Sequence, residues 1–364
     1  MTIIPLVLGI ILFCYIAGCI SESTENSLKQ GINSNDQGQS VIITDALNRS
    51  VTFNERPRRI ITANQGAVPL LLVLGAGERI VGVPSFVVED PVLAKNLPNA
   101  QIFAGSLQNV NCEQIIALKP DLVIEYIKYK PKCNSLLEKA GIPILYFNSF
   151  DLPEVRNNIA QMGKLTGDQE AAIEYINFTN SCDEILSSRI NNFSDHHPRV
   201  YMEFSTDYMT YGNGSKGDTL MNLLQVENIA HNLIEYPTIT PEWILKEDPD
   251  IIIKTVSSTA LRENSTTLED SYRSLLTRSG FSNLTAVKNN QVFVINNDLL
   301  MFTRQPAGAL YLAKILYPEK FSDIEPQMFL TEYAEKFMLG SDEIPTVFPN
   351  FQTGRATNST MMLV

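Results

Sequence analysis

Apolar and polar positions follow two alternating periods in the first part of the chain. Residues 67–77 (AVPLLLVLGAG) are apolar at helical spacing and end on Gly75 or Gly77, as helix C-termini commonly do. Stretches rich in β-branched residues lie before and after them and predict strands. These stretches are residues 41–53 (two short strands with an Asn-Arg turn), 58–63, 79–83, 121–127 and 143–147. Strands that alternate with helices predict βαβ units and a mostly parallel sheet.

The alternation stops at about residue 151 and resumes at residue 198. Residues 169–190 (QEAAIEYINFTNSCDEILSSRI) contain neither Gly nor Pro and predict one long helix. We therefore predict an α/β fold of two lobes, each with a central, mostly parallel sheet, joined by one long helix. The expected boundaries are 41–150 for the first lobe, 151–193 for the helical linker, 198–336 for the second lobe and closing helices, and 340–364 for a loose tail.

One unit occurs twice, once in each predicted lobe. Residues 111–126 (NCEQIIALKPDLVIEY) and 240–255 (TPEWILKEDPDIIIKT) share a polar start, a Glu, an apolar helical stretch, Pro-Asp and a β-branched run. Glu113 and Glu242 occupy the same place in the two copies. A Glu in a first helical turn interacts favourably with the helix dipole, by well under 1 kcal/mol. That explanation accounts for one such Glu more readily than for two matched ones.

Composition and charge limit the function classes. The chain has 364 residues, of which 44% are hydrophobic and 19% charged, so it is globular and long enough for two cores. The formal net charge of −12 argues against nucleic acid or an anionic membrane surface as a partner.

The N-terminal residues predict export. Residues 1–18 are apolar but short for a membrane span, and with Cys19 they form the sequence IAGC (residues 16–19), which resembles a lipobox. We expect cleavage before Cys19, a lipid on its thiol, and a flexible tether over residues 19–40. No Lys or Arg precedes the apolar run, so an uncleaved anchor helix remains the alternative. Both readings place the body of the protein outside the cytoplasmic membrane.

Three cysteines follow Cys19, namely Cys112, Cys133 and Cys182. Cys112 and Cys133 fall near strand–helix junctions of the first lobe, so they form either a disulfide or two buried free thiols. Several N-x-S/T sequons also leave glycosylation open.

Motifs for catalysis or metal binding find little support. GNGSKG (residues 212–217) matches G-x-G-x-x-G, but no acidic residue follows at the spacing of a dinucleotide site. We predict a turn into a helix there, with Asp218 as its N-cap. His196 and His197 adjoin and His231 stands apart, a poor set for zinc or manganese. GxSxG, HExxH and P-loop motifs do not occur, so we expect no catalysis, no metal and no cofactor.

Candidate ligand-binding residues lie in loops at the carboxyl ends of the predicted strands, where α/β folds bind ligands. Tyr offers a flat apolar face with a hydroxyl, and Arg suits carboxylate, phosphate or catecholate oxygens. The alternative is ordinary loop surface, and Tyr208, Tyr211 and Arg304 are favoured because they cluster. The complete set is Asn64, Gln65, Phe86, Tyr126, Tyr129, Tyr208, Tyr211 and Arg304.

The chain resembles the extracytoplasmic substrate-binding lipoproteins of ABC importers for iron chelates and cobalamin, over about residues 41–336. The matching stretches are 41–83, 112–124 (CEQIIALKPDLVI), 211–230 (YGNGSKGDTLMNLLQVENIA), 240–253 (TPEWILKEDPDIII) and 305–321 (QPAGALYLAKILYPEKF). The resemblance implies a class III binding-protein fold, a monomer anchored at the outer face of the cell membrane, and a permease dimer with its ATPase as partners. It also implies capture of an iron chelate (siderophore or haem) or a corrinoid between the lobes, and docking of Glu113 and Glu242 on permease arginines.

Two other classes stay open beside transport. An extracytoplasmic enzyme on the same scaffold needs a nucleophile with a partnered base, and a surface interaction protein needs repeats or stalks. The sequence does not distinguish a ferric siderophore, haem, cobalamin or another oxyanion-bearing ligand.

Overall fold

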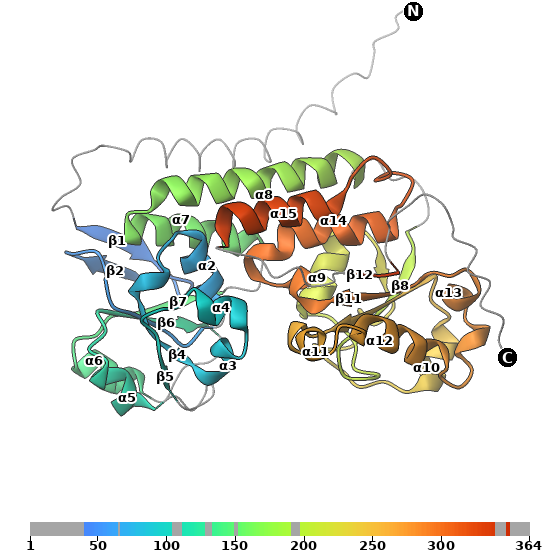
Figure 1. Cartoon of the computed structure of the whole chain (residues 1–364), viewed down its shortest axis with the longest axis horizontal. Helices are drawn as coiled ribbons and strands as arrows, with labels where there is room; N and C mark the ends of the chain where they lie inside the picture. Colours follow the sequence, from blue (N-terminus) through green and yellow to red (C-terminus); the bar gives the residue numbers. More distant parts are fainter. Residues whose placement is uncertain are drawn as a thin grey trace, which may run out of the picture.

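The computed structural model describes residues 40–64, 66–103, 111–127, 133–148, 152–190, 197–338 and 347–349. Cys19, Gln65 and Tyr129, which were singled out from the sequence, lie outside these residues. Two α/β lobes lie side by side, and a long helix runs along one side of both (Figure 1).

The first lobe is built on a parallel sheet with the strand order β5-β4-β3-β6-β7. Its strands are β3 (Ile60–Thr62), β4 (Ile80–Pro84), β5 (Gln101–Phe103), β6 (Leu122–Tyr126) and β7 (Ile144–Phe147). Its helices are α2 (Ala67–Val73), η1 (Gly77–Arg79), α3 (Ser85–Val88), α4 (Pro91–Lys95), α5 (Cys112–Ala117) and α6 (Asn134–Lys139). The antiparallel hairpin of β1 (Val41–Thr44) and β2 (Ser50–Phe53) precedes the sheet and confirms the two strands predicted there.

The second lobe repeats the design with the strand order β12-β11-β10-β8-β9. Its strands are β8 (Arg199–Glu203), β9 (Glu227–Asn228), β10 (Ile251–Val256), β11 (Val292–Asn296) and β12 (Val347–Phe348), and β12 alone pairs antiparallel. The helices between these strands are α9 (Lys216–Leu223), α10 (Pro241–Glu247), α11 (Ser258–Glu263), α12 (Thr267–Leu276), η2 (Phe281–Asn283) and α13 (Thr285–Lys288). After β11 follow η3 (Asn297–Leu300), η4 (Phe302–Arg304), α14 (Gln305–Leu316) and α15 (Pro326–Phe337).

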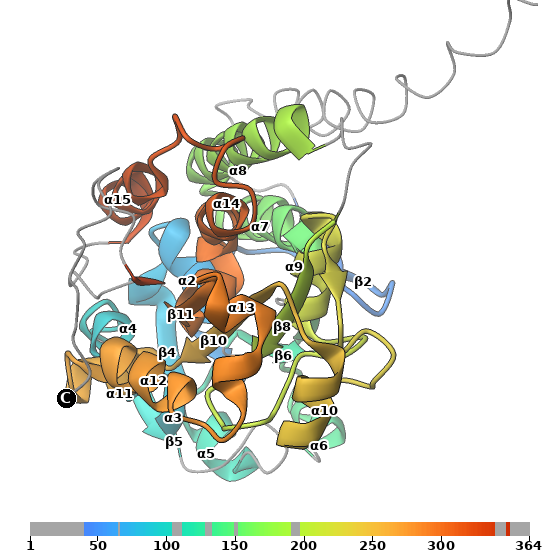
Figure 2. The ribbon, with the colours of Figure 1, turned by 90° about the vertical axis from the view of Figure 1, so that its right-hand side faces the viewer.

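Helices α7 (Leu152–Thr166) and α8 (Gln169–Ile190) connect the lobes, and α8 confirms the long helix predicted from the sequence. Figure 2 shows α8 and α14 side by side above both sheets. All residues of α14 are buried, and a Cβ at Gly308 would collide with the carbonyl oxygen of Leu299. The largest hydrophobic cluster contains residues of both lobes together with α8 and α14. The two lobes therefore share one core.

The prediction of a glycine at the end of α2 is confirmed, and the prediction of the N-cap of α9 is wrong. Gly75 has φ +69° directly after the C-cap of α2, as predicted for a glycine at that end. Asp218 is not the N-cap of α9, because Ser215 takes that place and its Oγ accepts the N–H of Asp218 at 3.2 Å. Ser215 is extended and Asp218 already helical, so the helix begins three residues earlier than expected.

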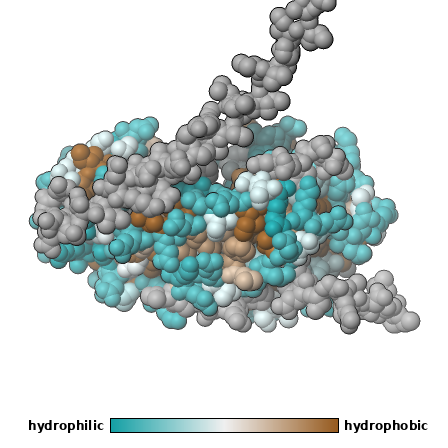
Figure 3. Space-filling view, turned by 90° about the horizontal axis from the view of Figure 1, so that it is seen from above, coloured by the Kyte–Doolittle hydropathy of each residue, from teal (hydrophilic) through white to brown (hydrophobic). Residues whose placement is uncertain are grey.

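The hydropathy of the described surface and helices bears on whether they include a membrane-spanning helix or a strongly apolar surface. Viewed from the α8 side, most described residues are hydrophilic and the apolar ones form separate small groups (Figure 3). Within the described ranges, none of the helices combines the length and apolarity that crossing a bilayer requires.

Candidate functional site

The duplicated unit begins in the same way in both lobes. The side chain of Asn111 caps α5 by accepting the N–H groups of Glu113 and Gln114 at 3.1 and 3.2 Å. Thr240 caps α10 by accepting the N–H of the residue after Glu242, at 3.3 Å. Each Glu therefore occupies the second position of a capped helix, and both side chains are exposed.

The two copies also end alike. Lys119 and Asp248, which follow the helices, have φ +48° and +43°, a conformation unusual for non-glycine residues. The next carboxylates, Asp121 and Asp250, accept backbone N–H groups at the start of β3 and β8, both at 2.9 Å. The repeat seen in the sequence is therefore a repeat in three dimensions, with the same caps and turns.

Helices α5 and α10 both lie on the side of the molecule opposite α8 (Figures 1 and 2). Each carries an exposed Glu in its first turn. We define these two helices, with Glu113 and Glu242, as the matched-Glu surface. Each lobe therefore contributes one exposed first-turn Glu, on helices that lie on the same side of the molecule.

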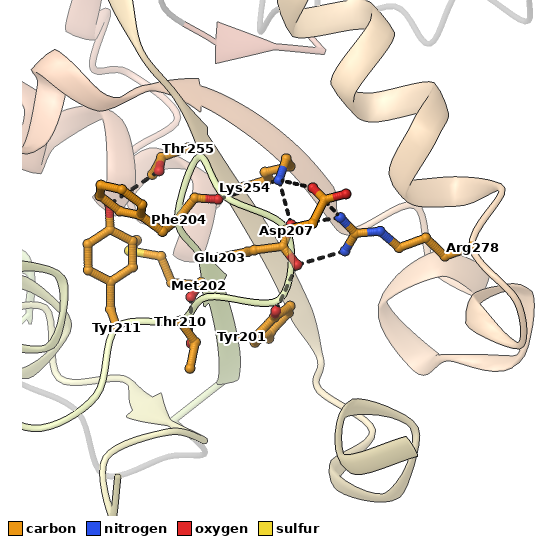
Figure 4. Close-up of polar contacts among 10 residues, drawn as sticks. All are labelled: Tyr201, Met202, Glu203, Phe204, Asp207, Thr210, Tyr211, Lys254, Thr255 and Arg278. Carbon is orange, nitrogen blue, oxygen red and sulfur yellow. Dashed lines mark hydrogen bonds and ion pairs between the residues drawn. The ribbon is translucent and has the colours of Figure 1, made fainter. Parts of the chain in front are cut away.

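The carboxyl end of β8 holds a buried ionic cluster (Figure 4). Glu203, which is fully buried, accepts Lys254 Nζ at 2.6 Å and two Arg278 nitrogens at 2.7 and 2.9 Å. Tyr201 Oη donates to the same carboxylate at 2.8 Å. Asp207 joins at the surface, 2.8 Å from Lys254 and 2.7 Å from Arg278.

The electrostatics of this cluster make Glu203 a structural group. Burial acts to raise the pKa of Glu203, but hydrogen bonds and charge from Arg278 and Lys254 outweigh it and lower that pKa. A carboxylate with both oxygens committed to cations is not available to a ligand. The cluster instead fixes the loop after β8 to the end of α12.

The equivalent position in the first lobe holds a buried carboxyl group without an ion pair or hydrogen bond. Glu125 of β6 corresponds to Lys254 of β10 in the repeat. The register of β3 with β6, continued by one residue, puts Ala63 beside it where the second lobe has Glu203. Glu125 is 1% exposed and neither carboxyl oxygen has a hydrogen-bond partner. Burial raises its pKa to about 8, although Tyr146 and Arg49 act in the opposite direction.

The predicted ligand residues of the first lobe are mostly buried. Asn64 is buried, donates Nδ2 to the carbonyl that ends β7 at 3.2 Å, and accepts a backbone N–H two residues on at 3.0 Å. These bonds shape the turn from β3 into α2. Tyr126 is buried at the end of β6, and Phe86 is half-buried in α3 against the shared core.

The three favoured residues of the second lobe do not form one cluster. Tyr208 has φ +63° and lies under the Arg278 guanidinium, 4.5 Å from ring centroid to Cζ. Tyr211 and Arg304 instead meet the turn Asn297–Asp298, with bonds of 3.3 Å and 3.2 Å respectively. The structure thus groups Tyr211 with Arg304 and places Tyr208 on the α12 side of the sheet.

Tyr211 forms an aromatic trio with Phe204 and Tyr236. Its ring lies 5.5 Å from Phe204 and 5.7 Å from Tyr236, and those two are 5.8 Å apart, all edge-on. Tyr236 is 40% exposed, so the trio offers an aromatic surface to solvent beside the carboxyl end of β8. Neither Phe204 nor Tyr236 was predicted, because they are 32 residues apart in the sequence and no local pattern indicates that their rings meet.

Lys216, the first residue of α9, lies near Asp298 and was not among the ligand-binding residues predicted from the sequence. It is half-buried, and within the described part of the chain its Nζ has neither a hydrogen bond nor an ion pair. Burial lowers its pKa to about 8, while the charge of Asp298 acts to raise it. A partly desolvated ammonium with no partner suits an anionic group.

An ion pair joins the lobes directly. Arg262 of α11 lies 3.1 Å (Nη2 to Oδ1) from Asp90, in the turn between α3 and α4. Its Nε is buried without a hydrogen-bond partner. The pair links two elements that face each other across the molecule in Figure 1.

A surface cavity of about 490 Å³ lies at the amino ends of β8 and β9. Trp243 of α10 and His231 line it, and His231 Nδ1 is 2.9 Å from the buried Asp218. None of the predicted ligand residues that the structure describes lines this cavity. Among the described residues, His, Cys, Asp and Glu side chains form no group of three or more suited to a metal ion.

Comparison with known proteins identifies the family of this chain. The family described as "Periplasmic binding protein" matches residues 60–299. An uncharacterized ABC transporter substrate-binding lipoprotein of Bacillus subtilis, YvrC, is 27% identical, covering 78% of this chain and 87% of its own. A cobalamin-binding protein of Halobacterium salinarum is 25% identical, covering 72% of this chain and 69% of its own.

Solved structures share the fold. The TroA-like periplasmic binding protein FepB of Veillonella parvula superposes with a TM-score of 0.73 at 24% identity, over 84% of this chain and 99% of its own. The molybdate-binding protein MolA of Haemophilus influenzae, with molybdate bound, gives 0.70 at 22% identity, over 84% and 100%. The two-lobed architecture with its bridging helix is thus an established binding-protein architecture.

Proposed function

Because the chain belongs to the periplasmic binding protein family, we propose that it is the substrate-binding component of an ABC importer, anchored by a lipid on Cys19 at the outer face of the cell membrane. The duplicated unit carries the proposal. Two lobes that present the same capped helix and the same exposed Glu on one side suit a partner with two equivalent halves. A permease dimer is such a partner.

The ligand class proposed is an iron chelate or a corrinoid. Relatives named for cobalamin, vitamin B12 and haem binding support it. The aromatic trio, with the exposed ring of Tyr236, offers flat apolar area for a large planar ligand. Lys216 and Arg304 supply positive charge for carboxylate, phosphate or catecholate oxygens.

A small oxyanion is the second candidate ligand. The similarity to the molybdate-binding MolA favours it, as does the unpartnered ammonium of Lys216. The two candidates make opposite demands on the aromatic surface, because molybdate has no apolar face to cover.

Titration of the purified protein with cyanocobalamin, haemin, a ferric catecholate and molybdate tests both. For a planar ligand, Tyr236→Ala should weaken binding about 5- to 150-fold, the loss expected for about 1–3 kcal/mol of aromatic contact. Tyr236→Phe keeps the ring and is the matched control. For molybdate, both variants should bind like the wild type, and Lys216→Met should be the damaging change. Failure of all four compounds to bind would contradict the proposed ligand classes.

The proposed role of the matched-Glu surface is docking on arginines of the permease. Two carboxylates on exposed first turns can meet two equivalent cationic sites without burying other charges. Such paired charges set register and speed encounter more than they add affinity. The alternative is that each Glu only stabilises its own helix terminus.

Reconstituted vesicles containing the importer distinguish these readings. Glu113→Ala combined with Glu242→Ala should leave ligand affinity unchanged and remove most of the stimulation of the ATPase. Glu170→Ala is the matched control, since Glu170 is also an exposed first-turn residue but belongs to α8 on the opposite side. Full stimulation by the double variant would leave only the helix-terminus role.

A further inference from the structure

Two thiols meet at the start of neighbouring helices in the first lobe. Cys112 is the first residue of α5, and Cys133 is the N-cap of α6. Both belong to the hydrophobic cluster between these helices and the sheet, with Cys133 2% exposed and Cys112 half-buried. Neither thiol forms a disulfide in this structure, and the two lie close enough that Cys112, after burial, contributes to raising the pKa of Cys133.

The third described thiol, Cys182, has a different environment. It is fully buried in α8 within the shared core of the two lobes, which contains neither Cys112 nor Cys133. A disulfide needs Cβ atoms about 3.5–4.5 Å apart, which only side chains already in contact satisfy without backbone movement. Among these three cysteines, the fold therefore selects a single pair.

We propose that Cys112 and Cys133 oxidise to a disulfide in the exported protein, and that this bond ties the matched-Glu helix of the first lobe to its neighbour. Compartments outside the cytoplasmic membrane are oxidising, and adjacent thiols there form disulfides. The proposal rests on the extracytoplasmic location proposed above. It does not depend on the identity of the ligand.

The exposure of the two thiols gives the order of steps. The half-buried Cys112, as thiolate, attacks the disulfide of an oxidised dithiol protein, forming a mixed disulfide and releasing one thiolate of that protein. Cys133, whose proton passes to solvent, then attacks the Cys112 sulfur and releases the second thiolate. Two thiols are oxidised to one disulfide, and the partner disulfide is reduced to a dithiol. Burial raises the pKa of Cys133 to about 12, in keeping with the slower, resolving role.

The bond would close a loop that contains β6 and the buried Glu125. It would also act next to Glu113, the residue after Cys112. Helix α5 has only six residues, so a covalent tie at its first turn limits how far that Glu can move. The second lobe has Pro241 at the equivalent position, where a fixed φ serves the same end without oxidation.

Differential alkylation of the wild-type chain tests the proposal directly. Protein exported to an oxidising compartment is denatured in one alkylating reagent, then reduced and treated with a second. Among Cys112, Cys133 and Cys182, only Cys182 should carry the first label, and the peptides of Cys112 and Cys133 should carry the second. First label on both Cys112 and Cys133 in exported protein would overturn the proposal. This readout needs no ligand or importer, so its failure is separable from failure of the proposed function.

Thermal unfolding with and without a reductant provides the second measurement. Reduction should lower the Tm of the exported wild type by roughly 5 °C, as expected when a loop of this size loses its cross-link. Cys112→Ala with Cys133→Ala should show the same Tm in both conditions. Cys182→Ala, the control, should keep the reductant-dependent shift. A wild-type Tm that does not respond to reductant would count against the bond.

Discussion

Replacing Glu125 with Gln should make the folded protein more stable, increasingly so as the pH rises. The carboxyl group is buried, neither oxygen has a hydrogen bond, and the position that holds Glu203 in the other lobe holds Ala63 here. The folded state therefore keeps the proton: burial raises the pKa of Glu125 from 4.5 to about 8. Gln has the same shape and no charge to desolvate.

The size of the effect follows from proton linkage. Between pH 4.5 and about 8 the folded state holds a proton that the unfolded chain has released, so stability falls as the pH rises. Each pH unit in that window costs the folded state about 1.4 kcal/mol. By pH 7 the accumulated cost is about 3 kcal/mol, and it stops growing above about pH 8.

Urea unfolding of the wild type and Glu125→Gln at pH 5, 6, 7 and 8.5 measures this difference. The two free energies of unfolding should nearly coincide at pH 5 and separate to about 3 kcal/mol at pH 7. Glu203→Gln is the control with the opposite sign, because it leaves Lys254 and Arg278 short of a buried partner and should destabilise by about 3–5 kcal/mol. Parallel stability curves for wild type and Glu125→Gln would refute the assignment of a buried, unpaired carboxyl group.

Three further changes test the second lobe, the contact between lobes and the anchor. Arg304→Ala should weaken an anionic ligand by about 1.5–3 kcal/mol in calorimetry, the value of a charge-assisted contact, and unchanged affinity would remove Arg304 from the site. Arg262→Gln should lower the free energy of unfolding by less than about 1 kcal/mol, since its ion pair is partly exposed, but should raise both the association and dissociation rates of the ligand in stopped-flow, because the lobes separate more easily. Equal ligand association and dissociation rates for Arg262→Gln and the wild type would show that the ion pair does not control separation of the lobes. Mass spectrometry of the protein from its own membrane should find no peptide upstream of Cys19, and an intact N-terminal peptide would show that cleavage does not occur.

The sequence was sufficient for the features that depend on local pattern. The Gly-free, Pro-free stretch predicted α8, and the β-branched runs predicted β3, β4, β6 and β7 of the first sheet and β10 of the second, because periodicity and propensity act within a few residues. The short strands β5, β9 and β12 were not predicted. The repeat predicted matched helices, and the caps at Asn111 and Thr240 confirm them. The prediction failed at Asp218, because Ser215, three residues earlier, is an equally good N-cap and precedes the first residue of the helix.

Side-chain environments were harder to predict, since they depend on partners far along the chain. Tyr208 and Tyr211 are three residues apart, yet one packs under Arg278 and the other joins Tyr236. Tyr208 has a left-handed backbone conformation (φ +63°), which changes the direction of the chain before Tyr211. No residue nearby in the sequence predicts that conformation. The lack of a partner for Glu125 could not be predicted for the same reason. In the sequence Glu125 is one charged residue in a buried strand, and only the sheet register shows that its neighbour is alanine.

The shared core has a consequence for the order in which the protein can be completed. Helix α14 is buried along its whole length against α8 and belongs to the same hydrophobic cluster as α2 of the first lobe. A nascent chain therefore cannot close the first lobe against its final neighbours until residue 316 has left the ribosome. Most of the polypeptide must therefore be synthesised before the shared core of the two lobes is complete. The same dependence means that a fragment ending before α14 should remain open to proteases however intact its own sheet is.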